Sequence, residues 1–249
     1  MRNVKLTIEY DGARFSGWQT QVRNKRKTIQ QEIIKACKKL LREKVNLIGA
    51  GRTDAGVHAE GQVANFRTRS HLPLYNIKKG LNRYLPRDIA ILKAEEVGVR
   101  FHAQHDALRK LYRYTIINKK ERSPLMSRYT SLVTYDLDIG KMKRSAKPLK
   151  GRKDFRSFQA SDKKERSSIR AIKRLEIIKK GHIIEVLIEA DGFLYNMVRN
   201  IVGTLIDVGR GFTAPEKVKD ILAGKNRKLA GKTAPAKGLT LVKAYYGKK

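Results

Sequence analysis

The chain has 249 residues, of which 56 are Lys or Arg and 23 are Asp or Glu, so its formal net charge is +33. Hydrophobic residues make up 41% of the sequence, which suits one or two globular domains and excludes a disordered tail. Cys37 is the single cysteine, which excludes an intramolecular disulfide and a thiolate-based zinc site. The apolar runs are too short for a membrane-spanning helix, and the first residues lack the apolar core of a signal peptide. We therefore expect a cytoplasmic protein.

The positive charge is spread along the chain. A surplus of this size opposes self-association unless a polyanion neutralises it. Its distribution favours a broad surface that follows a phosphate backbone, so nucleic acid is expected ahead of an anionic membrane. No homeodomain, zinc-finger or basic-zipper pattern is present in the sequence, and DNA is not the expected partner. The basic stretches are residues 23–27, 35–44, 141–156, 163–166 and 225–237.

In the first half of the chain, strand and helix patterns alternate. Val4 to Tyr10 alternates apolar and polar residues, as a half-buried strand does. Thr28 stands where a helix N-cap is expected, with Gln31 as its capping-box partner. The helix that follows is predicted to bury Ile29, Ile33, Cys37, Leu40 and Leu41. Further strands are expected at residues 45–50, 62–68 and 89–97, and a second helix opens at Pro73.

The second half repeats this mixture. Helical spacing occurs over residues 138–149 and 195–208, and Thr213 is expected to cap a short helix that ends at Ala223. Strands are expected at residues 110–117, 169–178, 182–190 and 239–246. The sequence therefore predicts a mixed α/β fold of the α+β type, with a sheet-plus-helix domain in each half. We place the domains at residues 1–105 and 106–249.

A glycine-rich loop at residues 49–56 is the segment most informative about chemistry. Its glycines allow a sharp turn and a close approach to a ligand, and Asp54 stands at its crest. For an aspartate in such a loop, a hydrogen bond to its own turn is the ordinary role. A dinucleotide site is disfavoured, because Asp54 occupies the position of the last glycine and no amphipathic helix follows.

Two other kinds of site are possible from the residue pattern, a metal site and a methyltransferase site. His58, or His102 and His105 with Asp106, would supply metal ligands, but no ligand set converges in the sequence and no metal is expected. Residues 205–211 resemble the acidic-x-Gly-x-Gly turn of a methyltransferase. That turn should follow a strand, whereas the residues before it have a helical period. A helix ended by Gly209 is the favoured interpretation.

Several segments, taken together and in order, resemble the TruA family of tRNA pseudouridine synthases. The loop segment from Gly51 to Ala59, followed by Gly61-Gln62-Val63, is similar to the family's signature. The match extends along the chain from residue 4 to the C-terminus, so it is highly specific. The other matching segments are residues 10–12, 15–19, 101–103, 112–114, 154–158, 193–203 and 233–239. Lys110 and Leu111 depart from the family, which often has more basic residues before Tyr112.

The resemblance implies a two-domain fold with a central antiparallel sheet and a basic active-site cleft. It implies a homodimer in which each tRNA touches both subunits. The reaction implied is the isomerisation of uridine to pseudouridine at positions 38, 39 and 40 of the anticodon stem-loop. No cofactor is implied, since the reaction consumes no redox equivalent or methyl donor.

The resemblance also assigns roles to four residues. Asp54 matches the catalytic carboxylate, which either adds covalently to the nucleotide or assists glycal formation. Arg199 matches the arginine that pairs with it and keeps it charged and oriented. Tyr112 matches the active-site tyrosine, which stacks on the extruded uracil and helps to move the C5 proton. Arg52 matches a residue that helps to flip the target base.

A second hypothesis is a non-catalytic RNA-binding module that keeps the same fold. The presence of Asp54, Tyr112 and Arg199 together favours the enzyme. A cofactor-dependent tRNA methyltransferase is the third hypothesis.

Overall fold

The computed structural model describes residues 1–20, 27–160 and 167–247. These residues form two compact units. The first comprises residues 1–108 together with the last strand from residue 240 onward, and the second comprises residues 109–239. The basic stretch at residues 163–166, and residues 23–26 of the first basic stretch, lie outside the described residues.

The sheet of the first unit is built around β1 (Arg2–Tyr10), which pairs antiparallel with β3 (His58–Thr68) on one side and β4 (Ile89–Val97) on the other. The short strand β2 (Ile48–Gly49) also pairs antiparallel with β3. The last strand, β10 (Leu239–Tyr246), adds to β3 in parallel. The strand that follows the Asp54 loop therefore lies in the interior of this sheet.

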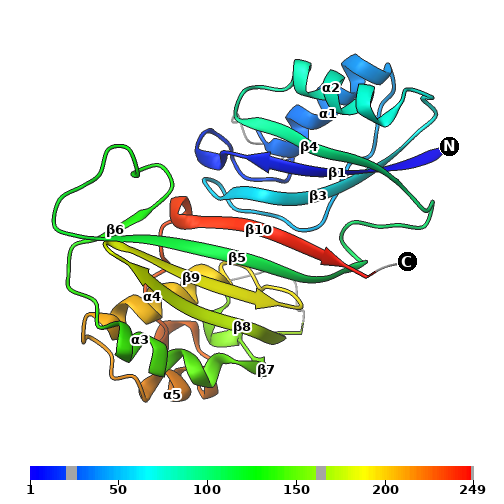
Figure 1. Ribbon diagram of the computed structural model, residues 1–249. Coiled ribbons are helices and arrows are strands. Elements are labelled where there is room, and N and C mark those ends of the chain that lie inside the picture. The colour runs from blue at the N-terminus through cyan, green and yellow to red at the C-terminus, as the bar shows by residue number, and fades with distance from the viewer. Residues whose placement is uncertain (21–26, 161–166, 248–249) are drawn as a thin grey trace. The chain divides into compact units, whose positions relative to one another are not determined.

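Two helices pack on the sheet of the first unit, α1 (Ile29–Leu41) and α2 (Leu74–Tyr84), and Figure 1 shows them side by side. The N-cap at Thr28 is confirmed, because its side-chain oxygen accepts a hydrogen bond of 3.3 Å from the backbone N–H of Gln31. The helix α1 buries Ile29, Ile33 and Cys37 as predicted, whereas Leu40 is only half-buried.

The sheet of the second unit has the strand order β5 (Ala107–Asn118), β9 (Ile183–Ala190), β8 (Ile169–Lys180), β7 (Gly151–Asp154), with antiparallel neighbours. The short strand β6 (Ser131–Val133) pairs in parallel with β5. The period-two burial of β5 and β9 places apolar residues on the face that packs on the helices.

The helices of the second unit are α3 (Ile139–Ala146), α4 (Met197–Gly209) and α5 (Lys217–Ala223) (Figure 1). The 3₁₀ turn η2 (Lys147–Leu149) continues α3. Asp138 begins α3, and its carboxylate accepts a hydrogen bond of 2.9 Å from the N–H of Lys141. Helix α4 is buried along most of its length, so it forms the core of this unit.

The α+β class is confirmed, and most predicted elements lie within a few residues of their expected bounds. Two details are wrong. Only Ile48–Gly49 of the strand expected at residues 45–50 forms a ladder, because the carbonyl of Leu47 instead accepts a hydrogen bond from the Gln30 side chain. Thr213 does not cap α5. Its N–H bonds to the carbonyl of Asp207 and helps to close α4, and α5 begins later, after Glu216.

The favoured interpretation of residues 205–211, a helix ended by Gly209, is confirmed. Residues 205–209 are the last turn of α4, so no strand leads into a nucleotide-binding turn there. Within the described residues, no helix combines the length and the apolar character needed to cross a bilayer.

Candidate active site

Asp54 lies in a tight turn between β2 and β3, in the first unit. Its carbonyl oxygen accepts a hydrogen bond of 3.1 Å from the N–H of Val57, and Gly56 supplies the positive φ of +79° that this turn uses. Asp54 is half-buried and Arg52 is exposed. The turn therefore presents a carboxylate at the surface of the unit, with a guanidinium two residues before it.

The backbone around Asp54 is held from both sides. The carbonyl of Thr53 accepts a hydrogen bond of 3.1 Å from the N–H of Trp18, and the Thr53 hydroxyl lies 2.8 Å from the hydroxyl of Tyr10. The side chain of Gln62 donates to the carbonyl of Gly51 at 2.9 Å. Tyr10 and Thr53 are buried, and burial raises the pKa of Tyr10 to about 12, so its hydroxyl stays neutral and keeps this bond at ordinary pH.

The N-terminal segment at residues 12–18 approaches the loop more closely than a side chain would allow. A Cβ added to Gly12 would lie 1.9 Å from the carbonyl oxygen of Val57. A Cβ added to Gly17, whose φ is +84°, would lie 2.3 Å from the carbonyl oxygen of Thr53. Both glycines are therefore required for the segment to pack against the backbone of the Asp54 loop.

His58 belongs to this packing. Its Nδ1 lies 3.1 Å from the carboxylate of Asp11 and also 3.1 Å from the backbone nitrogen of Gly12. In the turn at residues 102–106, the backbone N–H of His102 donates to the carboxylate of Asp106 at 3.0 Å, and the backbone N–H of His105 donates to Nδ1 of His102 at 3.2 Å. In the part of the chain that the structure describes, no group of three or more His, Cys, Asp or Glu residues is arranged to hold a metal ion.

Tyr112 lies in β5 of the second unit and is buried, with 7% of its surface exposed. The ring of Phe193 meets it edge to face, with a centroid separation of 5.0 Å. Two residues further along the same face, the Tyr114 hydroxyl donates a hydrogen bond of 2.8 Å to the carbonyl of Pro235. Burial raises the pKa of Tyr114 to about 12, so this donor keeps its proton.

Arg199 lies in the first turn of α4. Its Nε donates to the carbonyl of Ala234 at 2.8 Å, and another guanidinium nitrogen donates to the side-chain oxygen of Asn196 at 3.0 Å. The N–H of Ala234 in turn bonds to the carbonyl of Arg199. The guanidinium of Arg199 is half-buried, and these two hydrogen bonds fix its orientation.

Asn200 is fully buried in α4. It binds Thr233, the neighbour of the residue whose carbonyl accepts from Arg199. Its amide oxygen accepts from Thr233 at 2.7 Å and from Arg227 at 2.9 Å, and its amide nitrogen donates to the carbonyl of Phe158 at 2.8 Å. The sequence alone predicts no role for Asn196 or Asn200. A buried amide within an otherwise apolar helix is the sequence signal for such a network.

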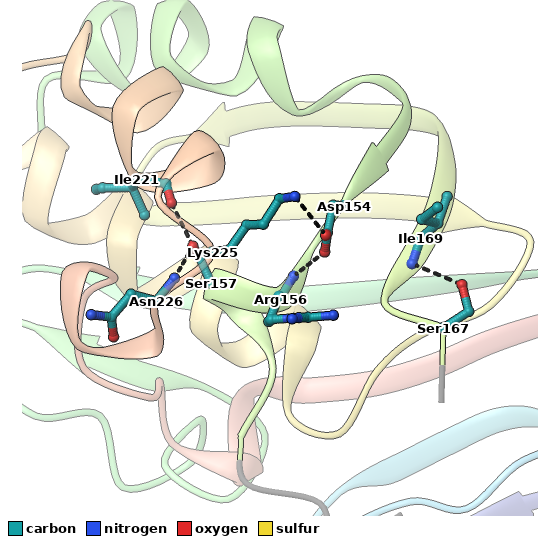
Figure 2. A network of polar contacts seen from close by, with 8 residues as sticks. All are labelled: Asp154, Arg156, Ser157, Ser167, Ile169, Ile221, Lys225 and Asn226. Carbon is teal, nitrogen blue, oxygen red and sulfur yellow. Dashed lines mark hydrogen bonds and ion pairs between the residues drawn. The ribbon is translucent and has the colours of Figure 1, made fainter. Parts of the chain in front are cut away.

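The segment at residues 154–158, which resembles the family, is structural. Figure 2 shows that the Ser157 hydroxyl donates to the carbonyl of Ile221 at 2.5 Å and accepts from the N–H of Asn226 at 2.9 Å. The carboxylate of Asp154 accepts from the N–H of Arg156 at 3.0 Å and lies 3.7 Å from the ammonium of Lys225. This segment fastens α5 and the turn after it to the rest of the second unit.

The structure thus divides the four predicted site residues between the two units. Asp54 and Arg52 share one loop of the first unit. Tyr112 and Arg199 lie in the second unit, where Tyr114, two residues after Tyr112, and Arg199 bond to the adjacent carbonyls of Pro235 and Ala234.

The mixed α/β fold is the one that the resemblance to an RNA-modifying isomerase implies. The family model described as tRNA pseudouridine synthase matches residues 6–106 and 145–247. The chain belongs to the tRNA pseudouridine synthase family, whose members are isomerases that act on tRNA.

The similarity to curated relatives extends over the whole chain. A tRNA pseudouridine synthase A 2 of Clostridium perfringens is 46% identical over 246 residues, which is 99% of this chain and 100% of the relative. The tRNA pseudouridine synthase A of Thermoanaerobacter sp. strain X514 is 47% identical over the same shares of both chains. That of Clostridium kluyveri is 48% identical over 247 residues, 99% of this chain and 100% of the relative.

Among solved structures, a chain of a Cbf5–Nop10–Gar1 complex aligns with 84% of this chain and 55% of that chain at 11% identity. The TM-score is 0.37, a likeness too slight to support a conclusion.

The close approach at Gly17 yields a stability and activity prediction. Gly17→Ala is expected to lower both the free energy of unfolding and the turnover on tRNA, because the added Cβ displaces the backbone at Thr53 and moves Asp54. The matched control is Gly151→Ala, whose φ of +89° carries the same backbone penalty of about 1 kcal/mol but whose Cβ would meet nothing within 4 Å.

Urea unfolding and single-turnover assays on both variants test this prediction. Gly151→Ala should lose stability and keep turnover. Wild-type turnover in Gly17→Ala would contradict the positioning role of the N-terminal segment.

Proposed function

We propose that this enzyme isomerises uridine to pseudouridine at positions 38, 39 and 40 of the tRNA anticodon stem-loop, with Asp54 as its catalytic carboxylate. The observation that carries the proposal is the loop of Asp54, whose backbone is fixed by Tyr10, Trp18 and Gln62 while its side chain is half-buried. A loop held in this way supports a group that must meet one atom of a substrate. The names of the relatives support the substrate class.

The reaction exchanges one bond for another within a single nucleotide. The bond between C1′ of the ribose and N1 of uracil breaks, the base turns, and C1′ bonds to C5, which gives up its proton. Asp54 serves this reaction as an ionised carboxylate, either by adding to the nucleotide or by accepting a proton on the glycal route. Both routes need a carboxylate, and neither consumes a donor or an oxidant.

Arg199 is proposed to pair with Asp54 and keep it charged and oriented. Support comes from its fixed geometry, because the carbonyl of Ala234 and the side chain of Asn196 set the plane of the guanidinium. A guanidinium beside a carboxylate favours the ionised form that either route requires.

Tyr112 and Arg52 are proposed to handle the extruded base. The edge-to-face contact with Phe193 fixes the Tyr112 ring, which suits it to stack on uracil for about 1–3 kcal/mol. Its hydroxyl is the proposed acceptor or relay for the C5 proton. Arg52 is exposed on the Asp54 loop and is proposed to enter the space that the flipped base leaves.

Asp54→Asn is expected to abolish turnover while tRNA affinity stays within about a few-fold of wild type, because the amide keeps the shape but cannot act as a nucleophile or base. The measurement is tritium release from tRNA labelled at uridine C5, with no methyl donor added. Transcripts that keep uridine at only one of the three positions show which of them is modified. Asp220→Asn, which removes an exposed carboxylate from α5, is the control and should keep wild-type turnover.

Two results would count against these assignments. Release by Asp54→Asn would remove this residue from the mechanism. Binding of tRNA by the wild type without release would favour the non-catalytic RNA-binding module.

Affinity for tRNA is expected to fall about 100-fold between about 50 and about 200 mM salt, as for about four phosphate contacts. The physical reason is the release of counterions when the basic surface meets the backbone, given the net charge of +33. Filter binding across a salt series measures the slope. An affinity that does not change with salt concentration would contradict binding along the phosphate backbone.

We further propose that the active form is a homodimer that binds each tRNA with both subunits. The family resemblance supports this proposal, and so do large apolar side chains that are exposed in the second unit, including Leu125 and Phe212. At about 150 mM salt, which screens the net charge of +33, sedimentation equilibrium should give twice the mass of the chain. The mass of a single chain at micromolar concentration would contradict it.

A further inference from the structure

The helices α1 and α2 of the first unit carry cations that no carboxylate of the described residues neutralises. Glu32 is the one acidic residue of α1, and it lies 3.0 Å from the ammonium of Lys35. Glu43, just after α1, accepts from the Thr68 hydroxyl and the N–H of Arg69. Helix α2 has no acidic residue. Within the described residues, the other exposed cations of α1, its C-cap and α2 form no ion pair; they are Lys38, Lys39, Arg42, Lys78, Lys79 and Arg83.

These cations repel one another along each helix. Residues four apart on a helix are neighbours, and like charges at that spacing are destabilising. Lys38 and Arg42 have this spacing at the end of α1, and Lys79 and Arg83 have it on α2. An arrangement that breaks a local rule without a compensating contact is typical of a functional surface.

The packing of the two helices brings these cations onto one surface. A Cβ added to Gly80 of α2 would lie 2.5 Å from the side chain of Leu40 in α1, so the helices are in close contact there. Near this contact, the ammonium of Lys39 lies 6.0 Å from the ring centroid of Tyr84. The residues just before Gly80 and Tyr84 in the sequence are both exposed cations. Figure 1 shows the two helices side by side. We call these cations, together with Tyr75 and Tyr84, the α1–α2 surface.

Two lysines of the α1–α2 surface lie over aromatic rings. The ammonium of Lys79 lies 6.0 Å from the ring centroid of Tyr75, as that of Lys39 does from the ring of Tyr84. Both rings are exposed. An aromatic face attracts an ammonium but does not remove its charge. The tyrosines therefore restrain two cations that remain available to an anion.

The position of α1 indicates which part of an RNA would meet this surface. Its first turn is close to the Asp54 loop, because the N–H groups of Ile29 and Gln30 donate to the carbonyls of Gly17 and Trp18, at 3.1 and 3.0 Å. A helix of 13 residues is about 20 Å long. The cations near the end of α1 are therefore separated from that loop by most of the length of the helix.

We infer that the α1–α2 surface binds the phosphate backbone of tRNA outside the anticodon arm. Clustered cations without carboxylate partners suit a polyanion, and a phosphate backbone is the polyanion that this family meets in its substrate. A membrane-binding helix would expose Trp, Phe or Leu, whereas the large hydrophobic side chains exposed on α1 and α2 are Tyr75 and Tyr84. The inference rests on the proposed function in one respect, since it takes the anticodon arm to be held at Asp54.

Charge removal on α2 tests the inference. Lys79→Gln combined with Arg83→Gln should weaken binding of full-length unmodified tRNA about tenfold at about 100 mM salt and reduce the salt slope by about two phosphate contacts. Binding of an isolated anticodon stem-loop should stay within about twofold of wild type, because that RNA does not reach the surface. Lys79→Arg combined with Arg83→Lys keeps both charges and should bind full-length tRNA as the wild type does.

The matched control is Lys143→Gln combined with Lys147→Gln. It also removes two exposed charges four residues apart, from α3 and the turn η2 of the second unit, and should bind full-length tRNA within about twofold of wild type. Equal losses in the control and in the α2 variant would make net charge the cause and overturn the inference. An equal loss on full-length tRNA and on the stem-loop would also overturn it.

Thermal unfolding separates a binding role from a structural one. The α2 variant relieves the repulsion between Lys79 and Arg83, so it should unfold at the wild-type temperature or above it. A lower unfolding temperature with unchanged tRNA affinity would overturn the inference and make these cations structural. Binding to anionic phospholipid vesicles that the α2 variant loses, with unchanged tRNA affinity, would overturn it in favour of a membrane.

Phosphate ethylation interference locates the contact on full-length tRNA. Some phosphates outside the anticodon stem-loop should weaken wild-type binding when they are ethylated and have no effect on the α2 variant. Sensitive phosphates confined to the anticodon stem-loop would overturn the inference. Absence of tritium release by the wild type, with the expected interference pattern, would instead overturn the proposed function alone.

Discussion

Two adjacent carbonyl oxygens, those of Ala234 and Pro235, determine the arrangement of the second unit. One accepts from Arg199 of α4 and the other from Tyr114 of β5, so a helix and a strand far apart in the sequence share one backbone segment. Asn200 fixes that segment from the core through Thr233. A change in any of these bonds would move the guanidinium and the tyrosine face together. The positions of Arg199 and of the β5 face that carries Tyr114 therefore depend on the same backbone segment.

In the first unit, close packing of two backbone segments positions Asp54. The absence of side chains at Gly12 and Gly17 permits this contact. The Tyr10 hydroxyl contacts the Thr53 hydroxyl, and the Gln62 amide donates to the carbonyl of Gly51. These contacts fix the backbone on the N-terminal side of Asp54.

Local patterns were predictable from the sequence, and long-range bonds were not. The cap at Thr28 was predictable because its partner is three residues away. Thr213 has the same chemistry, but its N–H is drawn to Asp207 at the end of the preceding helix, which periodicity cannot show. The bonds of Arg199 to Ala234 and of Tyr114 to Pro235 could not be predicted for a second reason. Their acceptors are main-chain carbonyls, and every residue has one, so the sequence does not show which carbonyl is used. The four candidate site residues came from the family resemblance, since the residue pattern alone favoured an ordinary turn for Asp54.

The burial of Trp18 has a practical consequence. It is the only tryptophan in the sequence, its indole lies against Gly49, and its backbone bonds to Thr53, next to Asp54. Tryptophan emission from this protein therefore originates beside the loop of the catalytic candidate and reports on the first unit alone. An emission shift that precedes the loss of helical circular dichroism would reveal loosening of the Asp54 loop while α3, α4 and α5 are still folded. The native chain thus contains its own optical probe of the local order of that loop.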